Sequence, residues 1–107
     1  MRVTHALVQI ATALMSAPKE RHWGYRLSAT CGVLSGALYP RLAQMVEAGW
    51  LESGREPAEK AAGRPPRIYY TLTETGKTEL GALLARAATD PRFESINLRR
   101  NPRNGNS

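Results

Sequence analysis

The residues best suited to chemistry are the arginines of a short Gly/Pro-rich segment, Gly63-Arg64-Pro65-Pro66-Arg67. Glycine and proline keep such a segment thin and extended. A thin segment fits a narrow DNA minor groove, whose negative potential attracts arginine. We therefore expect Arg64 to insert into that groove, with Lys60, Arg67 and Tyr69 as further DNA-contact candidates. The alternative is a flexible loop with incidental charges, which the nearby Glu56 and Glu59 favour.

A second group of candidates lies on an expected helix over residues 36–48, with Ser35 as its N-cap. Small residues at its start would allow close approach to DNA, and the helix N-terminus favours a phosphate. We expect Arg41 or Gln44 to read a base and Tyr39 to contact the backbone, although these side chains could equally form a solvated face with Tyr39 partly in the core. The candidates on this helix are Ser35, Gly36, Ala37, Tyr39, Pro40, Arg41 and Gln44. Arg26 in the preceding helix and Arg99, Arg100 and Arg103 near the C-terminus are weaker candidates for phosphate contacts.

Hydrophobic periodicity predicts the elements that must position these side chains. Helices are expected over 3–16, 24–30 and 36–48, the second with Tyr25 and Leu27 as buried anchors. Gly32 and Gly49 suit the positive φ that ends a helix. Strands are expected over 50–53 and 67–72 around an exposed loop, and Thr73 caps a last helix that ends at Asp90-Pro91. This order predicts a mainly α fold with a small β-hairpin, the winged helix-turn-helix.

Composition agrees with a DNA-binding protein. The 107 residues suggest one domain, and fifteen Lys and Arg against nine Asp and Glu give a net charge of +6, which suits a polyanionic partner. No apolar run approaches a membrane span, and the single Cys31 fits a small buried residue in a reducing cytoplasm. His5 and His22 have no second ligand at metal spacing, and no catalytic or cofactor motif occurs. We expect no enzyme activity, metal or cofactor, and a cytoplasmic, nucleoid-associated protein that does not enter a membrane.

The motifs also carry a family resemblance. Gly24-Tyr25, Ser35-Gly36-Ala37-Leu38-Tyr39-Pro40, Gly63-Arg64-Pro65, Tyr69-Tyr70 and Leu72-Thr73-Glu74-Thr75-Gly76 resemble the PadR-like transcriptional regulators over about residues 5–80. The resemblance implies a homodimeric regulator whose first and last helices make the dimer contacts, here through Leu7, Ile10, Leu14, Leu80, Leu83, Leu84 and Ala87. Some members bind a small aromatic effector at the dimer centre. The short C-terminal region here argues against such a pocket and shifts dimer contacts toward the first helix.

The expected organisation is a winged helix-turn-helix domain with flanking dimerisation helices over residues 1–89, followed by a basic, disordered tail over 90–107. The expected function is sequence-specific binding of double-stranded DNA by a homodimeric repressor. A phage or plasmid architectural or accessory DNA-binding protein is an alternative. A winged-helix adaptor between proteins is a further one, although the positive charge and the arginine-bearing loop argue against it.

Overall fold

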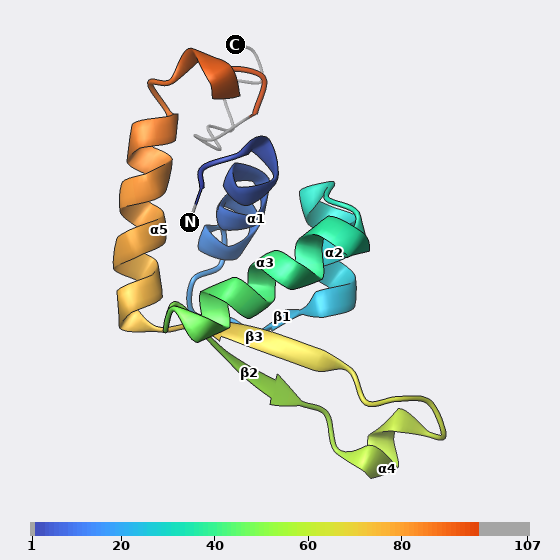
Figure 1. The fold of residues 1–107 in the computed structure, drawn as a ribbon. Helices are drawn as coiled ribbons and strands as arrows, with labels where there is room; N and C mark the ends of the chain where they lie inside the picture. The colour runs from blue at the N-terminus through green and yellow to red at the C-terminus, as the bar shows by residue number, and fades with distance from the viewer. Residues whose placement is uncertain (1, 97–107) are drawn as a thin grey trace.

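The computed structural model describes residues 2–96, and it contains the expected helices and hairpin strands in the expected order, together with three short elements that were not predicted, β1, α4 and η1 (Figure 1). The helices are α1 (His5–Met15), α2 (Gly24–Cys31), α3 (Ser35–Glu47), the short α4 (Ala58–Ala61), α5 (Glu74–Ala87) and a 3₁₀ turn, η1 (Pro91–Phe93). The strands are β1 (His22–Trp23), β2 (Leu51–Arg55) and β3 (Ile68–Leu72). The predicted fold class is confirmed. None of the helices within residues 2–96 is long and apolar enough to cross a bilayer.

Local signals set most helix ends. The Thr4 hydroxyl accepts a hydrogen bond from Leu7 N at the start of α1, and Gly32 (φ 74°) and Gly49 (φ 81°) end α2 and α3 in the predicted left-handed conformation. The predicted N-cap of α3 is wrong by one residue. Leu34 occupies the N-cap position without a side-chain hydrogen bond, and Ser35 is the first helical residue.

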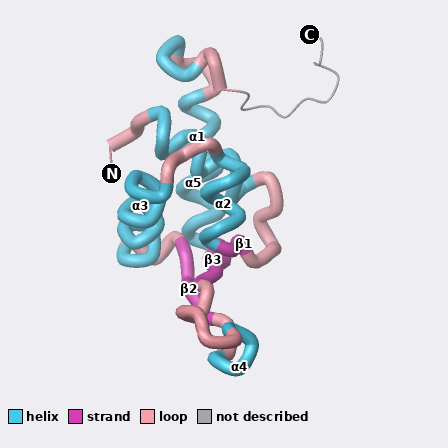
Figure 2. Tube along the Cα trace, turned by 90° about the vertical axis from the view of Figure 1, so that its right-hand side faces the viewer, coloured by secondary structure: helices cyan, strands magenta, loops and turns pink. Residues whose placement is uncertain are grey.

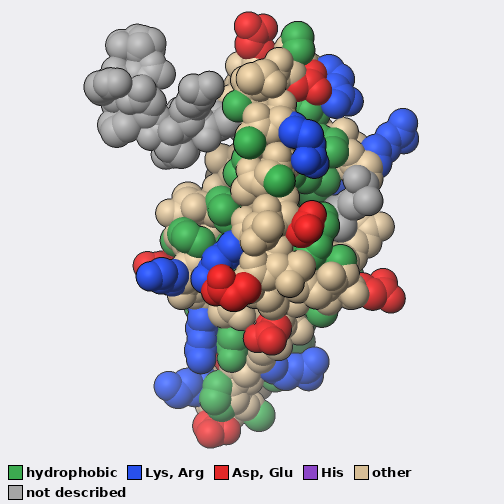
Figure 3. Space-filling view, turned by 90° about the vertical axis from the view of Figure 1, so that its left-hand side faces the viewer, with side chains coloured by type: hydrophobic (Ala, Val, Ile, Leu, Met, Phe, Trp, Pro, Cys, Tyr) green, Lys and Arg blue, Asp and Glu red, His purple; other side chains and the backbone are tan. Residues whose placement is uncertain are grey.

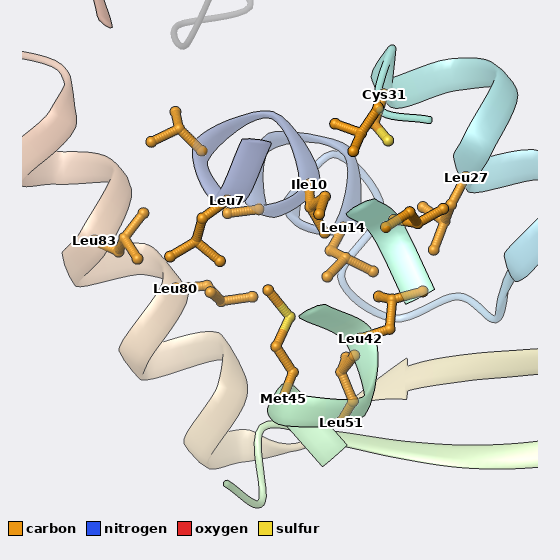
Figure 4. Packing of buried hydrophobic residues seen from close by; sticks show 14 of the residues in the cluster. Leu7, Ile10, Leu14, Leu27, Cys31, Leu42, Met45, Leu51, Leu80 and Leu83 are labelled. Atoms are coloured by element: carbon orange, nitrogen blue, oxygen red, sulfur yellow. The ribbon is translucent and has the colours of Figure 1, made fainter. Parts of the chain in front are cut away.

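The core surrounds α1, which α2, α3 and α5 all contact (Figure 4). This packing corrects the predicted dimer seam. Six of its seven residues are at most 5% exposed because they face one another inside one chain: Leu7, Ile10, Leu14, Leu80, Leu83 and Ala87. Only Leu84 keeps partial exposure. An apolar stripe on a helix has to pack against another apolar surface, and here that surface belongs to the same chain. Contacts between copies would therefore have to use other faces of α1 and α5.

The expected hairpin is present, but the sheet has a third strand. The order is β1-β3-β2, with all pairs antiparallel, and Trp23 lies opposite Tyr69. The residues just before α2, for which no strand was predicted, thus pair with the returning strand of the wing. Figure 2 shows that β2 and β3 carry the wing, including α4, away from the helical body.

The C-terminal boundary also differs from the prediction. Phe93 is 2% exposed, and its ring packs edge-on against His5 at a centroid distance of 5.1 Å. Residues 90–96 therefore belong to the folded domain rather than to the tail. The expected disorder beyond residue 96, and with it Arg99, Arg100 and Arg103, lies outside the described residues. Cys31 is 7% exposed, as expected of a small buried side chain.

Candidate nucleic-acid interface

Helix α3 presents several of the predicted contact residues to solvent, most of them in its first half. Ser35, Gly36, Pro40 and Gln44 are exposed, and Tyr39 is 38% exposed. Ala37 is half-buried. Arg41 behaves differently, because its Nη1 donates a hydrogen bond to the Ala37 carbonyl at 3.0 Å and the side chain lies back along the helix. In this conformation Arg41 is half-buried, whereas Gln44, the other predicted base reader, is exposed.

Tyr39 connects α3 to the start of α2. A Cβ at Gly24 would lie only 2.8 Å from the Tyr39 hydroxyl, so the ring can occupy its place only because residue 24 has no side chain. This close approach gives a physical reason for the Gly24-Tyr25 motif. It also puts Tyr39 beside the residues that flank Gly24.

Those residues belong to a set of stacked guanidinium and aromatic groups, the arginine–aromatic cluster: Arg21, Trp23, Tyr25, Arg26, Arg67 and Tyr69. The Arg21 guanidinium lies 4.1 Å from the Tyr69 ring centroid, and Arg67 lies 4.2 Å from that of Tyr25. Trp23 packs edge-on against Tyr69 at 5.1 Å. A Cβ at Gly54 on the neighbouring strand β2 would lie 2.3 Å from the Tyr69 ring. The ring therefore occupies space that is free because residue 54 has no side chain.

The cluster brings together three predicted DNA contacts, Arg26, Arg67 and Tyr69, with three residues that the sequence analysis assigned elsewhere or missed. Tyr25 was expected to be a buried anchor, yet it is 41% exposed. The Arg26 guanidinium beside it lowers the pKa of its phenol. A guanidinium stacked on a ring keeps its N–H edge free for a phosphate oxygen. The cluster is therefore chemically suited to the backbone of a nucleic acid.

The wing is more ordered than a flexible loop. Glu56 accepts hydrogen bonds from both Arg64 terminal nitrogens and from Arg67 N at 2.9 Å, while Glu56 N donates to the Arg67 carbonyl. The Arg64 guanidinium holds the pKa of the Glu56 carboxyl below its usual value. The Arg64 side chain is 37% exposed and is already paired with Glu56, a contact that the sequence analysis did not predict. Lys60 is exposed on α4.

Acidic and basic side chains mix along the α5 face, and at the wing end basic side chains lie on both sides of an acidic group at the tip (Figure 3). Contacts link three parts of the surface in turn: α3 reaches Gly24 through Tyr39, the cluster adjoins Gly24, and Arg67 joins the cluster to the wing. Sequence reasoning could have found Arg21 and Trp23 only by pairing residues 22–23 with the second tyrosine-bearing strand.

A separate hollow of about 710 Å³ opens between α1, α2 and the end of the described chain. Three hydroxyls in its lining, those of Thr12, Ser16 and Thr30, donate to carbonyls of their own helices. The small aromatic effector was expected at the centre of a dimer. This hollow in one chain does not test that expectation.

A helix-turn-helix followed by a basic wing defines a winged-helix protein of the DNA-binding type. Residues 14–82 match the transcriptional regulator PadR-like family, and the chain belongs to that family. It is therefore a DNA-binding transcriptional regulator, and the predicted resemblance is confirmed. Regulators of this family are typically not enzymes. A search of curated proteins finds no match.

Similar solved structures include the following two. The protein smu.1704 from Streptococcus mutans UA159 is 25% identical with a TM-score of 0.62, covering 82% of this chain and 82% of its own. A PadR family transcriptional regulator from Eggerthella lenta DSM 2243 is 26% identical with a TM-score of 0.58, covering 76% of this chain and 73% of its own. Both extend over most of either chain, so the similarity concerns the whole winged-helix body.

Proposed function

We propose that this regulator is a sequence-specific repressor that binds double-stranded DNA as a homodimer in the cytoplasm, on the nucleoid. In each copy α3 enters the major groove, the arginine–aromatic cluster contacts phosphates, and the wing reaches the neighbouring minor groove. The observation that carries the proposal is the exposed first half of α3, joined through Tyr39 to the arginine–aromatic cluster, whose arginines lie just before β1, on α2 and just before β3. Membership of a family of transcriptional regulators favours it over the accessory and adaptor alternatives.

The test is selection of bound duplexes from a random pool, followed by titration of the selected sequence at several salt concentrations. We expect an inverted repeat with half-sites about one helical turn apart. Six to ten neutralised phosphates would give a log–log salt slope of about −5 to −9. Sedimentation of the complex should show two copies per duplex. A protein with no salt-sensitive affinity for any duplex would contradict the proposal.

The wing offers a more local test. Because Glu56 holds Arg64, minor-groove insertion requires the guanidinium to exchange this carboxylate for DNA. Replacing Arg64 with alanine should weaken binding about tenfold when A·T-rich sequence flanks the half-sites, and less when G·C-rich sequence does, because the narrow A·T groove attracts arginine most. Fluorescence anisotropy on matched duplexes measures the difference.

Glu56→Gln supplies the opposite change. It weakens the hold on Arg64 while keeping an amide oxygen for Arg67 N, so affinity should rise. Glu59→Gln is the matched control, because it removes the same charge from an exposed side chain outside this ion pair. If the two glutamine variants bind equally well, and Arg64→Ala loses the same affinity at both kinds of flank, Arg64 does not read the groove.

A further inference from the structure

Leu34 stands at the start of α3 with its side chain almost entirely in water. It is 82% exposed, by far the most exposed of the large hydrophobic residues within 2–96, whereas its neighbour Val33 is 5% exposed. The residues that follow, Ser35 and Gly36, are small and exposed, and a Cβ at Gly36 would meet nothing within 4 Å. The leucine side chain therefore projects from an open helix end and takes no part in the core.

The same residue occupies a position where leucine is unfavourable. Leu34 is the N-cap of α3, with φ −64°, ψ 150° and no side-chain hydrogen bond to the first turn. Serine, threonine, asparagine and aspartate stabilise this position because their oxygens accept from the free N–H groups, and leucine cannot. In α1 and α5, by contrast, the N-cap residues are Thr4 and Thr73, and their side chains accept hydrogen bonds from the first turn of the helix. Exposure and an absent cap are independent costs, and local rules broken without a folding gain point to function.

We propose that Leu34 is a specificity-determining residue that reads the C5-methyl group of a thymine in the major groove. This inference rests on the proposed function. The start of the second helix of a helix-turn-helix faces base edges. Among the groups that the major groove presents, the thymine methyl is the apolar one that an aliphatic side chain can contact. A polar N-cap would stabilise the helix but would not recognise that methyl group.

The experiment combines a protein change with removal of the methyl group alone. Each thymine of the selected half-site is replaced in turn by deoxyuridine, and affinity is measured for the wild type, Leu34→Ser and Leu34→Met. At one position the wild type should lose about fourfold, the effect of burying one methyl group. Leu34→Met keeps an apolar side chain of similar size and should keep this loss, whereas Leu34→Ser should bind thymine and uracil equally.

Thermal unfolding provides the second readout. Because Leu34→Ser restores a cap, its Tm should rise by about 4–8 °C while thymine discrimination is lost. A purely structural role for Leu34 would not give these opposite effects. If the wild type is insensitive to deoxyuridine at every position, or if Leu34→Ser keeps the same sensitivity, the inference is overturned although DNA binding stands. If the wild type instead binds no duplex at all, the proposed function itself is overturned.

Discussion

Replacing Gly76 with alanine should lower the free energy of unfolding by about 3 kcal/mol and the Tm by at least about 12 °C. An alanine Cβ at this position would lie 2.0 Å from the Trp50 carbonyl oxygen and 2.8 Å from its carbon. That carbonyl cannot easily move away, because it accepts a hydrogen bond from Thr73 N at 3.0 Å. The Thr73 hydroxyl in turn donates to the Gly49 carbonyl and accepts from Gly76 N. The Leu72-Thr73-Glu74-Thr75-Gly76 motif thus fastens α5 against the turn between α3 and β2.

Gly81→Ala is the matched control in the same helix. Its Cβ would meet only Met15 Cε at 3.8 Å, an ordinary contact. Removing a glycine from a helix interior should raise the stability by about 0.5–1 kcal/mol. Thermal and urea unfolding followed by circular dichroism would measure both variants. A Gly76→Ala protein as stable as the Gly81→Ala protein would mean that α5 does not approach Trp50 as closely as the structure has it.

Replacing Gly36 with glutamate should weaken DNA binding about 100-fold without destabilising the fold. Gly36 lies in the first turn of α3, where no acidic residue is present and where a Cβ has open space. A glutamate there replaces a poor helix former and complements the helix dipole, so the free energy of unfolding should rise by about 1 kcal/mol. Against DNA the same carboxylate would face phosphates. Like charges at an interface cost several kcal/mol, and both copies of a dimer carry the change.

Thr78→Glu introduces the same charge at an exposed position on α5. Because exposed charges are screened by salt, it should weaken binding by no more than about threefold. Titration of the selected duplex at fixed ionic strength compares the two variants, and unfolding curves verify that both are folded. Equal losses for the two would place DNA elsewhere than at the start of α3.

Local signals in the sequence predicted most of the fold. The helices repeat apolar residues at helical spacing, and Gly32, Gly49 and Thr73 mark their ends by conformational preference or by hydrogen bonding, all of which act within a few residues. The predicted boundaries of α1, α2 and α3 accordingly agree with the structure within two residues, whereas α5 ends at Ala87, three residues before the predicted end at Asp90. The wing hairpin was also predictable, because Ile68–Leu72 is β-branched and aromatic.

The errors concern contacts between distant parts of the chain. The two residues of β1 are too few for any periodicity, and only pairing with β3 makes them a strand. The same pairing assembles the arginine–aromatic cluster, so Arg21 and Trp23 were not predicted as surface groups. An amphipathic stripe on α1 or α5 does not specify whether its partner is the same chain or a second copy. The ion pair between Arg64 and Glu56 depends on how the two sides of the wing come together.

The pairing of β1 with β3 has a consequence for the DNA. It joins Trp23, the residue that immediately precedes α2, to Tyr69 on the strand that returns from the wing. The two rings also pack edge-on against each other. The helix-turn-helix and the root of the wing are therefore joined into one unit, and we expect them to adjust to a duplex together rather than separately. If this unit spans two adjacent grooves, the duplex has to supply the matching groove width and bend. Base pairs that the protein never touches would then influence affinity through their deformability.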